Sequence, residues 1–174
     1  MVTLIIGCMF AGKTDTLHTK LNRDCFGKRS VYLTTKDTRH GGDSVTHSGT
    51  PVSDKVILVS LEWLVDNAHL LNNTTVGIDE IQFIDTTVLI PLIRKLSTKN
   101  RVFLAGLDQD YLGESFETSI RAVSESDKII RCKACCDKCG ADAIRTHRIT
   151  DSTDRILEGA KESYIPLCKE CRGF

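Results

Sequence analysis

A glycine-rich stretch near the N-terminus carries the clearest chemistry in the sequence. Residues 7–14 read Gly-Cys-Met-Phe-Ala-Gly-Lys-Thr and match the phosphate-binding pattern G-x-x-x-x-G-K-[S/T] in full. The glycines let backbone N–H groups surround phosphate oxygens, while Lys13 reaches the β- and γ-phosphates and Thr14 ligates Mg²⁺. The expected nucleotide contacts are Gly7, Met9, Phe10, Ala11, Gly12, Lys13 and Thr14. The alternative, a chance glycine-rich turn, does not explain why the stretch follows an apolar strand and opens a helix. The pattern therefore predicts binding of ATP or GTP.

Two adjacent acids follow a short apolar segment in the middle of the chain. Asp79 and Glu80 come directly after Val76, Gly77 and Ile78. An Asp at a strand end that faces a phosphate loop is the usual second anchor of Mg²⁺. Glu80 beside it could accept a proton from an attacking hydroxyl group. The alternative is that both acids form a solvated turn. The presence of the phosphate loop favours the magnesium and base roles over that alternative.

Cysteine pairs near the C-terminal end suggest a metal site. Cys136 with Cys139, and Cys168 with Cys171, form two C-x-x-C pairs, the pattern of a structural four-thiolate zinc site. Cys132 with Cys135 is also a C-x-x-C pair, so the spacing alone leaves the first pair ambiguous. We choose Cys136 and Cys139 because Gly140 follows and suits a tight metal-binding turn. Redox-active thiols are the alternative.

The segments around these motifs alternate between strand-like and helix-like patterns, and these elements must position the phosphate loop and the two acids. Apolar runs predict strands at residues 4–6, 31–33, 56–59, 76–78 and 102–105. Helical spacing of apolar residues predicts helices over 14–25, 61–71 and 88–96, and residues 36–54 form a long loop. This alternation predicts an α/β fold of the P-loop NTPase type, a mostly parallel sheet flanked by helices. In such sheets ligands bind at the carboxyl ends of the strands.

The pattern changes near residue 130, where cysteines cluster and apolar periodicity fades. We therefore expect a P-loop α/β domain over residues 1–130 and a small zinc-bound module over residues 131–174. A formal net charge of zero argues against a broad nucleic-acid or membrane surface. No apolar run reaches about 18 residues and no signal sequence is recognisable, so eight cysteines indicate reduced or metal-bound thiols in a cytoplasmic protein.

With these motifs identified, the sequence resembles thymidine kinases of the cellular, poxviral and Gram-positive type over nearly its whole length. The resemblance rests on several motifs in the family's order besides the two cysteine pairs. They are residues 7–14, 36–39 (Lys-Asp-Thr-Arg), 46–50 (Thr-His-Ser-Gly-Thr), 78–83 (Ile-Asp-Glu-Ile-Gln-Phe), 105–111 (Ala-Gly-Leu-Asp-Gln-Asp-Tyr) and 159–164 (Gly-Ala-Lys-Glu-Ser-Tyr). Two departures are Cys8, where many relatives have Pro, and Ile81, where several have Gly.

The resemblance implies a reaction and roles for individual residues. The reaction is transfer of the γ-phosphate of MgATP to the 5′-hydroxyl of thymidine, and of deoxyuridine, for salvage of deoxynucleosides. Glu80 is then the general base, while Asp37 and Arg39 lie near the phosphates and the reacting hydroxyl. The implied thymidine pocket consists of Met9, Gln82, Phe83, Leu107, Tyr111, Phe116, Thr146 and Tyr164. Taken singly, the aromatic residues of this set could equally be core residues, and Arg39 a surface charge.

The resemblance also implies partners, namely thymidine, ATP, structural Zn²⁺, dTTP as a feedback inhibitor, and three further copies of the chain in a homotetramer. It implies no nucleic-acid or membrane partner. Two other functions compete with the kinase. One is an ATPase or GTPase switch with a zinc ribbon. The aromatic pocket residues argue against it, because such a switch does not need them. The other is a nucleic-acid-binding zinc module, for which Lys133, Lys138, Arg145, His147 and Arg148 form a possible basic patch.

Overall fold

A six-stranded, wholly parallel β-sheet lies at the centre of the computed structural model, which describes residues 1–27, 30–35, 51–151 and 162–173. The strand order is β3-β2-β4-β5-β1-β6. The strands are β1 (Val2–Ile6), β2 (Val31–Thr35), β3 (Val56–Leu58), β4 (Thr75–Asp79), β5 (Arg101–Gly106) and β6 (Lys128–Arg131). The expected fold class, a mostly parallel sheet flanked by helices, is confirmed. Most of the loop expected over residues 36–54 lies outside the described residues.

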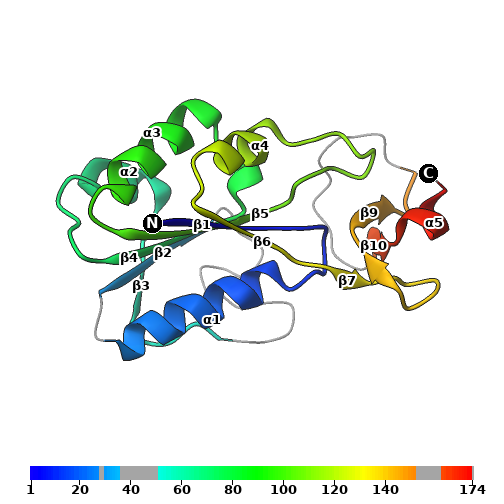
Figure 1. Cartoon of the computed structure of the whole chain (residues 1–174), viewed down its shortest axis with the longest axis horizontal. Coiled ribbons are helices and arrows are strands. Elements are labelled where there is room, and N and C mark those ends of the chain that lie inside the picture. Colours follow the sequence, from blue (N-terminus) through cyan, green and yellow to red (C-terminus); the bar gives the residue numbers. More distant parts are fainter. Residues whose placement is uncertain (28–29, 36–50, 152–161, 174) are drawn as a thin grey trace.

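Helices cover both faces of this sheet (Figure 1). Helix α1 (Lys13–Phe26) lies on one face, and α2 (Leu61–Asn67), α3 (Thr86–Ser97) and α4 (Glu117–Ser124) lie on the other. Side-chain caps begin two of them: Ser60 accepts a hydrogen bond from the backbone N–H of Trp63 at the start of α2, and Asp85 accepts one from that of Thr87 at the start of α3. The helix expected to reach Leu71 ends at Asn67, and residues 68–70 form a turn instead.

The alternation of side chains along the strands builds two apolar layers. In β1, Leu4 and Ile6 pack toward the face covered by α2, α3 and α4, whereas Ile5 packs with Leu17 and Leu21 of α1. Both faces of the sheet are therefore buried, which explains why its inner strands read as continuous apolar runs.

The C-terminal part of the chain forms a smaller unit beyond the carboxyl ends of the strands (Figure 1). It contains β7 (Ala134–Cys135) paired antiparallel with β8 (Asp142–Ala143), β9 (Arg145–Arg148) paired antiparallel with β10 (Tyr164–Leu167), and α5 (Lys169–Arg172). A third apolar cluster joins this unit to the loop between β1 and α1, because it includes Cys8 together with Cys136 and Leu167. The division into residues 1–130 and 131–174 stays a proposal.

Candidate active site

The phosphate-binding pattern forms the turn between β1 and α1, the structural context that it requires. Gly12 is the N-cap of α1 and has a left-handed backbone with φ 70°, which a residue with a side chain rarely adopts. Lys13 is almost fully buried, and its Nζ donates a hydrogen bond of 2.8 Å to the carbonyl oxygen of Cys8. Its ammonium group is thus folded back over the loop, where it can bind an anion that the loop encloses.

Asp79 ends β4 directly beside this loop. Its carboxyl group is buried, hydrogen bonds with the Thr14 side chain, and accepts a hydrogen bond of 2.8 Å from the backbone N–H of Glu80. Burial, and then the neighbouring charge of Glu80, raises the pKa of Asp79 to about 7. The two residues predicted to anchor Mg²⁺ are therefore in contact, and their oxygens suit that hard cation.

The side chain of Glu80 is held by a neighbour on the same turn. Gln82, which lies in the 3₁₀ helix η1 (Ile81–Phe83), donates a short hydrogen bond from Nε2 to a Glu80 carboxylate oxygen. Its Oε1 accepts the backbone N–H of Leu107 at 3.0 Å. Gly106 permits this approach, since a Cβ there would lie 2.7 Å from that Oε1. Gln82 thus fixes Glu80 against the carboxyl end of β5.

The residues matched to the thymidine pocket differ in exposure. Phe116, Thr146 and Tyr164 are buried, whereas the side chain of Phe83 is 44% exposed. Thr146 also contacts the phosphate loop, because its hydroxyl oxygen accepts the backbone N–H of Met9 at 3.0 Å. Of the predicted contacts, Asp37 and Arg39 lie outside the described residues.

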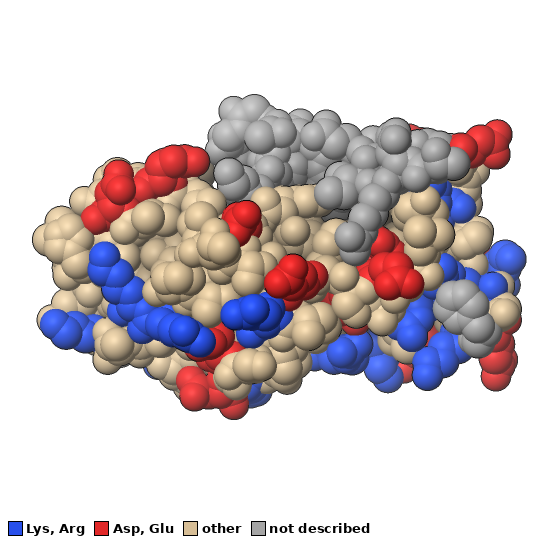
Figure 2. Space-filling model, turned by 90° about the horizontal axis from the view of Figure 1, so that it is seen from above, with Lys and Arg blue, Asp and Glu red and all other residues tan. Residues whose placement is uncertain are grey.

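The basic side chains of the C-terminal unit are largely engaged in contacts within the chain. Figure 2 shows Lys and Arg gathered at this end of the molecule. Yet Lys133 forms an ion pair of 2.7 Å with Asp142, Arg145 donates to the side chain of Gln109, and Arg148 is buried. The possible basic patch therefore loses part of its free charge to contacts within the chain. The sequence analysis placed Arg148 in that patch because charge alone does not reveal burial.

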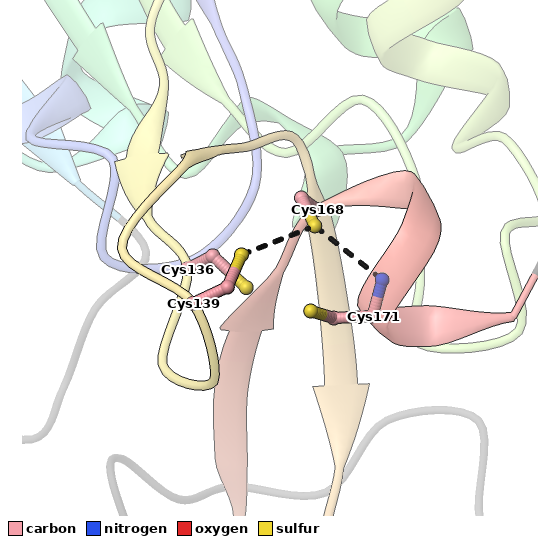
Figure 3. A group of neighbouring side chains, drawn as sticks. All are labelled: Cys136, Cys139, Cys168 and Cys171. Carbon is pink, nitrogen blue, oxygen red and sulfur yellow. Dashed lines mark hydrogen bonds between the residues drawn. The ribbon is translucent and has the colours of Figure 1, made fainter.

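Four cysteines converge in the C-terminal unit (Figure 3). The sulfur atoms of Cys136, Cys139, Cys168 and Cys171 all lie within 4.8 Å of one another, and those of Cys139 and Cys168 are 3.7 Å apart. A tetrahedral zinc site with Zn–S bonds of about 2.3 Å requires sulfur atoms about 3.8 Å apart. Cys135 is outside the group, since its sulfur is exposed and lies 3.4 Å from the Gly140 carbonyl oxygen.

The acidity of these thiols also fits a bound cation. Backbone hydrogen bonds, that from Cys168 foremost, lower the pKa of Cys136 to about 6. Hydrogen bonds with Cys139 and Cys168 raise the pKa of Cys171 to about 12, because adjacent sulfurs cannot all be ionised together. A divalent cation would remove that conflict, so the four donors could hold Zn²⁺ as thiolates. By contrast, burial raises the pKa of Cys8, in keeping with a neutral packing residue.

Comparison with known proteins decides the family. A family model described as thymidine kinase matches residues 1–172. The chain belongs to the thymidine kinase family. Two thymidine kinases of Bacteroides fragilis, from strains YCH46 and NCTC 9343, are each 34% identical to it over 174 residues, which covers 98% of this chain and 85% of theirs. Family membership makes the chain a kinase. Among its described residues, no helix is both long and apolar enough to cross a membrane.

Proposed function

We propose that this chain is an ATP-dependent phosphotransferase that converts thymidine, and deoxyuridine, to the 5′-monophosphate. One observation carries the proposal. Glu80, a carboxylate held by Gln82, adjoins Asp79, whose own carboxyl group contacts Thr14 of the phosphate loop. A base and a nucleotide-binding loop thus share one edge of the sheet, as transfer from ATP to a hydroxyl group requires.

Binding of the nucleotide is the task of the phosphate loop and its lysine. Backbone N–H groups of residues 7–14 and the ammonium group of Lys13 receive the phosphates, and Arg39, matched through its motif, adds a second positive charge. Thr14 and Asp79 would hold Mg²⁺, which when bound neutralises charge on the β- and γ-phosphate oxygens. Most of the rate enhancement comes from positioning and charge neutralisation, because phosphoryl transfer has a loose transition state.

Glu80 takes the proton of the reaction. The 5′-oxygen of thymidine forms a bond to the γ-phosphorus, the bond from that phosphorus to the β,γ-bridging oxygen breaks, and ADP leaves. The hydroxyl proton passes to the Glu80 carboxylate. Asp37 is matched to an acid near the phosphates.

The nucleoside is small, flat and neutral, so apolar and aromatic walls supply much of its binding. The proposed pocket residues are Met9, Gln82, Phe83, Leu107, Tyr111, Phe116, Thr146 and Tyr164. The four-cysteine cluster supports this pocket, because β10 carries Tyr164 and leads directly to Cys168. We also propose, from the family resemblance, a cytoplasmic homotetramer that dTTP inhibits.

The test is formation of thymidine 5′-monophosphate from thymidine and MgATP by the wild type and by Glu80→Gln. The wild type should turn over thymidine, and the variant should lose about 10²- to 10⁴-fold in kcat while it still binds ATP. Full activity of Glu80→Gln would remove the base assignment. Absence of any nucleoside phosphorylation by the wild type, with slow ATP hydrolysis, would favour the switch instead.

A further inference from the structure

Three arginines of the C-terminal unit reach the loop that follows β5. Arg145 of β9 donates to the side-chain oxygen of Gln109, and Arg172 at the end of α5 donates to the carbonyl oxygen of Tyr111. The guanidinium carbon of Arg148, also on β9, lies 3.7 Å from the centroid of the Tyr111 ring. The loop is therefore fastened to the C-terminal unit at two successive places, Gln109 and Tyr111.

Arg148 differs from the other two because it joins two aromatic residues. Its Nη2 donates a hydrogen bond of 2.6 Å to the hydroxyl oxygen of Tyr164, while its face lies over Tyr111. Only 7% of Arg148 is exposed. A planar guanidinium group can stack on one ring and donate in its own plane to another group, which the ammonium group of a lysine cannot do.

The loop has a defined shape of its own, so the arginines act on its position. The Oδ1 atom of Asp110 accepts the backbone N–H groups of Leu112 and Glu114, each at 2.9 Å. The backbone N–H of Phe116 donates to the carbonyl oxygen of Asp108 at 3.2 Å. A loop folded in this way can move as a unit, and its contacts with β9 then decide where Tyr111 lies.

We propose that Arg148 is a positioning residue for nucleoside recognition, which sets the distance between Tyr111 and Tyr164 across the pocket. The inference rests on the proposed function, since both tyrosines are assigned to the thymidine pocket there. Arg148 acts on thymidine through these rings and has no part in nucleotide binding. Its loss should therefore change the KM for thymidine and leave the KM for ATP unchanged.

The experiment compares Arg148→Met, Arg148→Lys and Tyr164→Phe with the wild type. Arg148→Met should raise the KM for thymidine by about 10- to 100-fold, because stacking and a charge-assisted hydrogen bond are both lost. Arg148→Lys keeps the charge and should recover only part of that loss. The KM for ATP should stay within about twofold of the wild-type value in all three. Arg94→Met is the matched control, since Arg94 forms an exposed ion pair with Glu125 on the far side of the sheet from α1.

Two further readouts make the outcome decisive. The double variant Arg148→Met/Tyr164→Phe should be no worse than Arg148→Met alone, because both changes remove the same hydrogen bond. Amide hydrogen exchange in residues 110–116 should become faster in Arg148→Met, and this readout does not depend on activity. Unchanged thymidine KM and unchanged exchange in variants of an active wild type would overturn the inference and leave the proposed function standing. If the wild type phosphorylates no nucleoside, the proposed function is wrong, and the inference that rests on it is wrong as well.

Discussion

At the scale of single residues, Glu80 has an unusual backbone conformation for a residue with a side chain. Glu80 has φ 53° and ψ 42°, a left-handed conformation that a residue with a side chain adopts at a cost of about 1 kcal/mol. The conformation turns the chain sharply from β4 into η1, so that Asp79 and Gln82 both contact Glu80. The backbone conformation that positions the proposed base thus lowers the stability of the folded chain.

Glycine at this position should relieve the cost. Because glycine adopts a left-handed backbone freely, Glu80→Gly should be more stable than Glu80→Ala by about 1 kcal/mol, and both should lack kinase activity. Denaturant unfolding of the two variants measures the difference. Equal stability of the two would contradict the strain at Glu80.

The raised pKa of Asp79 predicts how stability depends on pH in Mg²⁺-free buffer without nucleotide. An ordinary Asp has a pKa near 4, whereas that of Asp79 is about 7. Between these values the folded chain binds more protons than the unfolded chain, so the stabilisation present below about pH 4 is lost as the pH rises through 7. Asp79→Asn should therefore be more stable than the wild type at pH 8 by about 1–3 kcal/mol.

Thermal unfolding at several pH values measures that difference. Asp66→Asn is the matched control, because it makes the same change at a residue that is exposed on α2. A pH profile of Asp79→Asn that parallels the wild type would show that Asp79 ionises as an ordinary carboxyl group.

At the scale of elements, the phosphate loop is packed directly against the C-terminal unit. Cys8 lies in the same apolar cluster as Cys136 and Cys168, with Phe10 and Ala11 packed against it. The hydrogen bond from the Met9 N–H to Thr146 adds a polar contact. The four-cysteine cluster therefore supports the proposed nucleotide site as well as the proposed nucleoside pocket.

Loss of the proposed zinc ion should consequently weaken nucleotide binding. Cys139→Ser, or mild chelation of the wild type, should lower the affinity for ATP by about 10-fold or more, because the loop loses the surface on which it rests. Calorimetric titration with ATP measures this. Emission of the single tryptophan, Trp63, which stacks on Tyr32 at the sheet, should stay unchanged.

Cys135→Ser is the control for that experiment, since Cys135 lies next to the cluster but outside it. It should bind zinc and ATP as the wild type does. If the affinity for ATP is unchanged after full removal of the metal, the four-cysteine cluster does not support the phosphate loop.

The elements that the sequence predicted are those with a strong apolar pattern, such as α1 and β4. The elements that it missed lack such a pattern. In α4 the buried residues are Thr118, Ser119 and Ala122, which are small or polar. The edge strand β6 buries little, and its Ile129 is 44% exposed. Apolar periodicity finds elements that bury apolar side chains, so both escaped it.

At the scale of the whole molecule, the site is assembled from segments far apart in the sequence. The carboxyl ends of β1, β4 and β5 bring the phosphate loop, Asp79 and Leu107 to one edge of the sheet. A parallel sheet dictates that convergence, so it was predictable from the order of strands. The contact of Arg148 with Tyr111 was not, because no local pattern reports which charged side chain a distant loop will bury.

The most direct test of the whole proposal is the ratio of nucleoside monophosphate formed to ATP consumed, with thymidine, deoxyuridine, deoxycytidine and deoxyguanosine supplied separately. A thymidine kinase should form one thymidine 5′-monophosphate for each ATP consumed, turn over deoxyuridine, and leave deoxyguanosine unphosphorylated. ATP consumption that continues at the same rate without any nucleoside, with no monophosphate formed, would contradict the proposal and identify water as the acceptor.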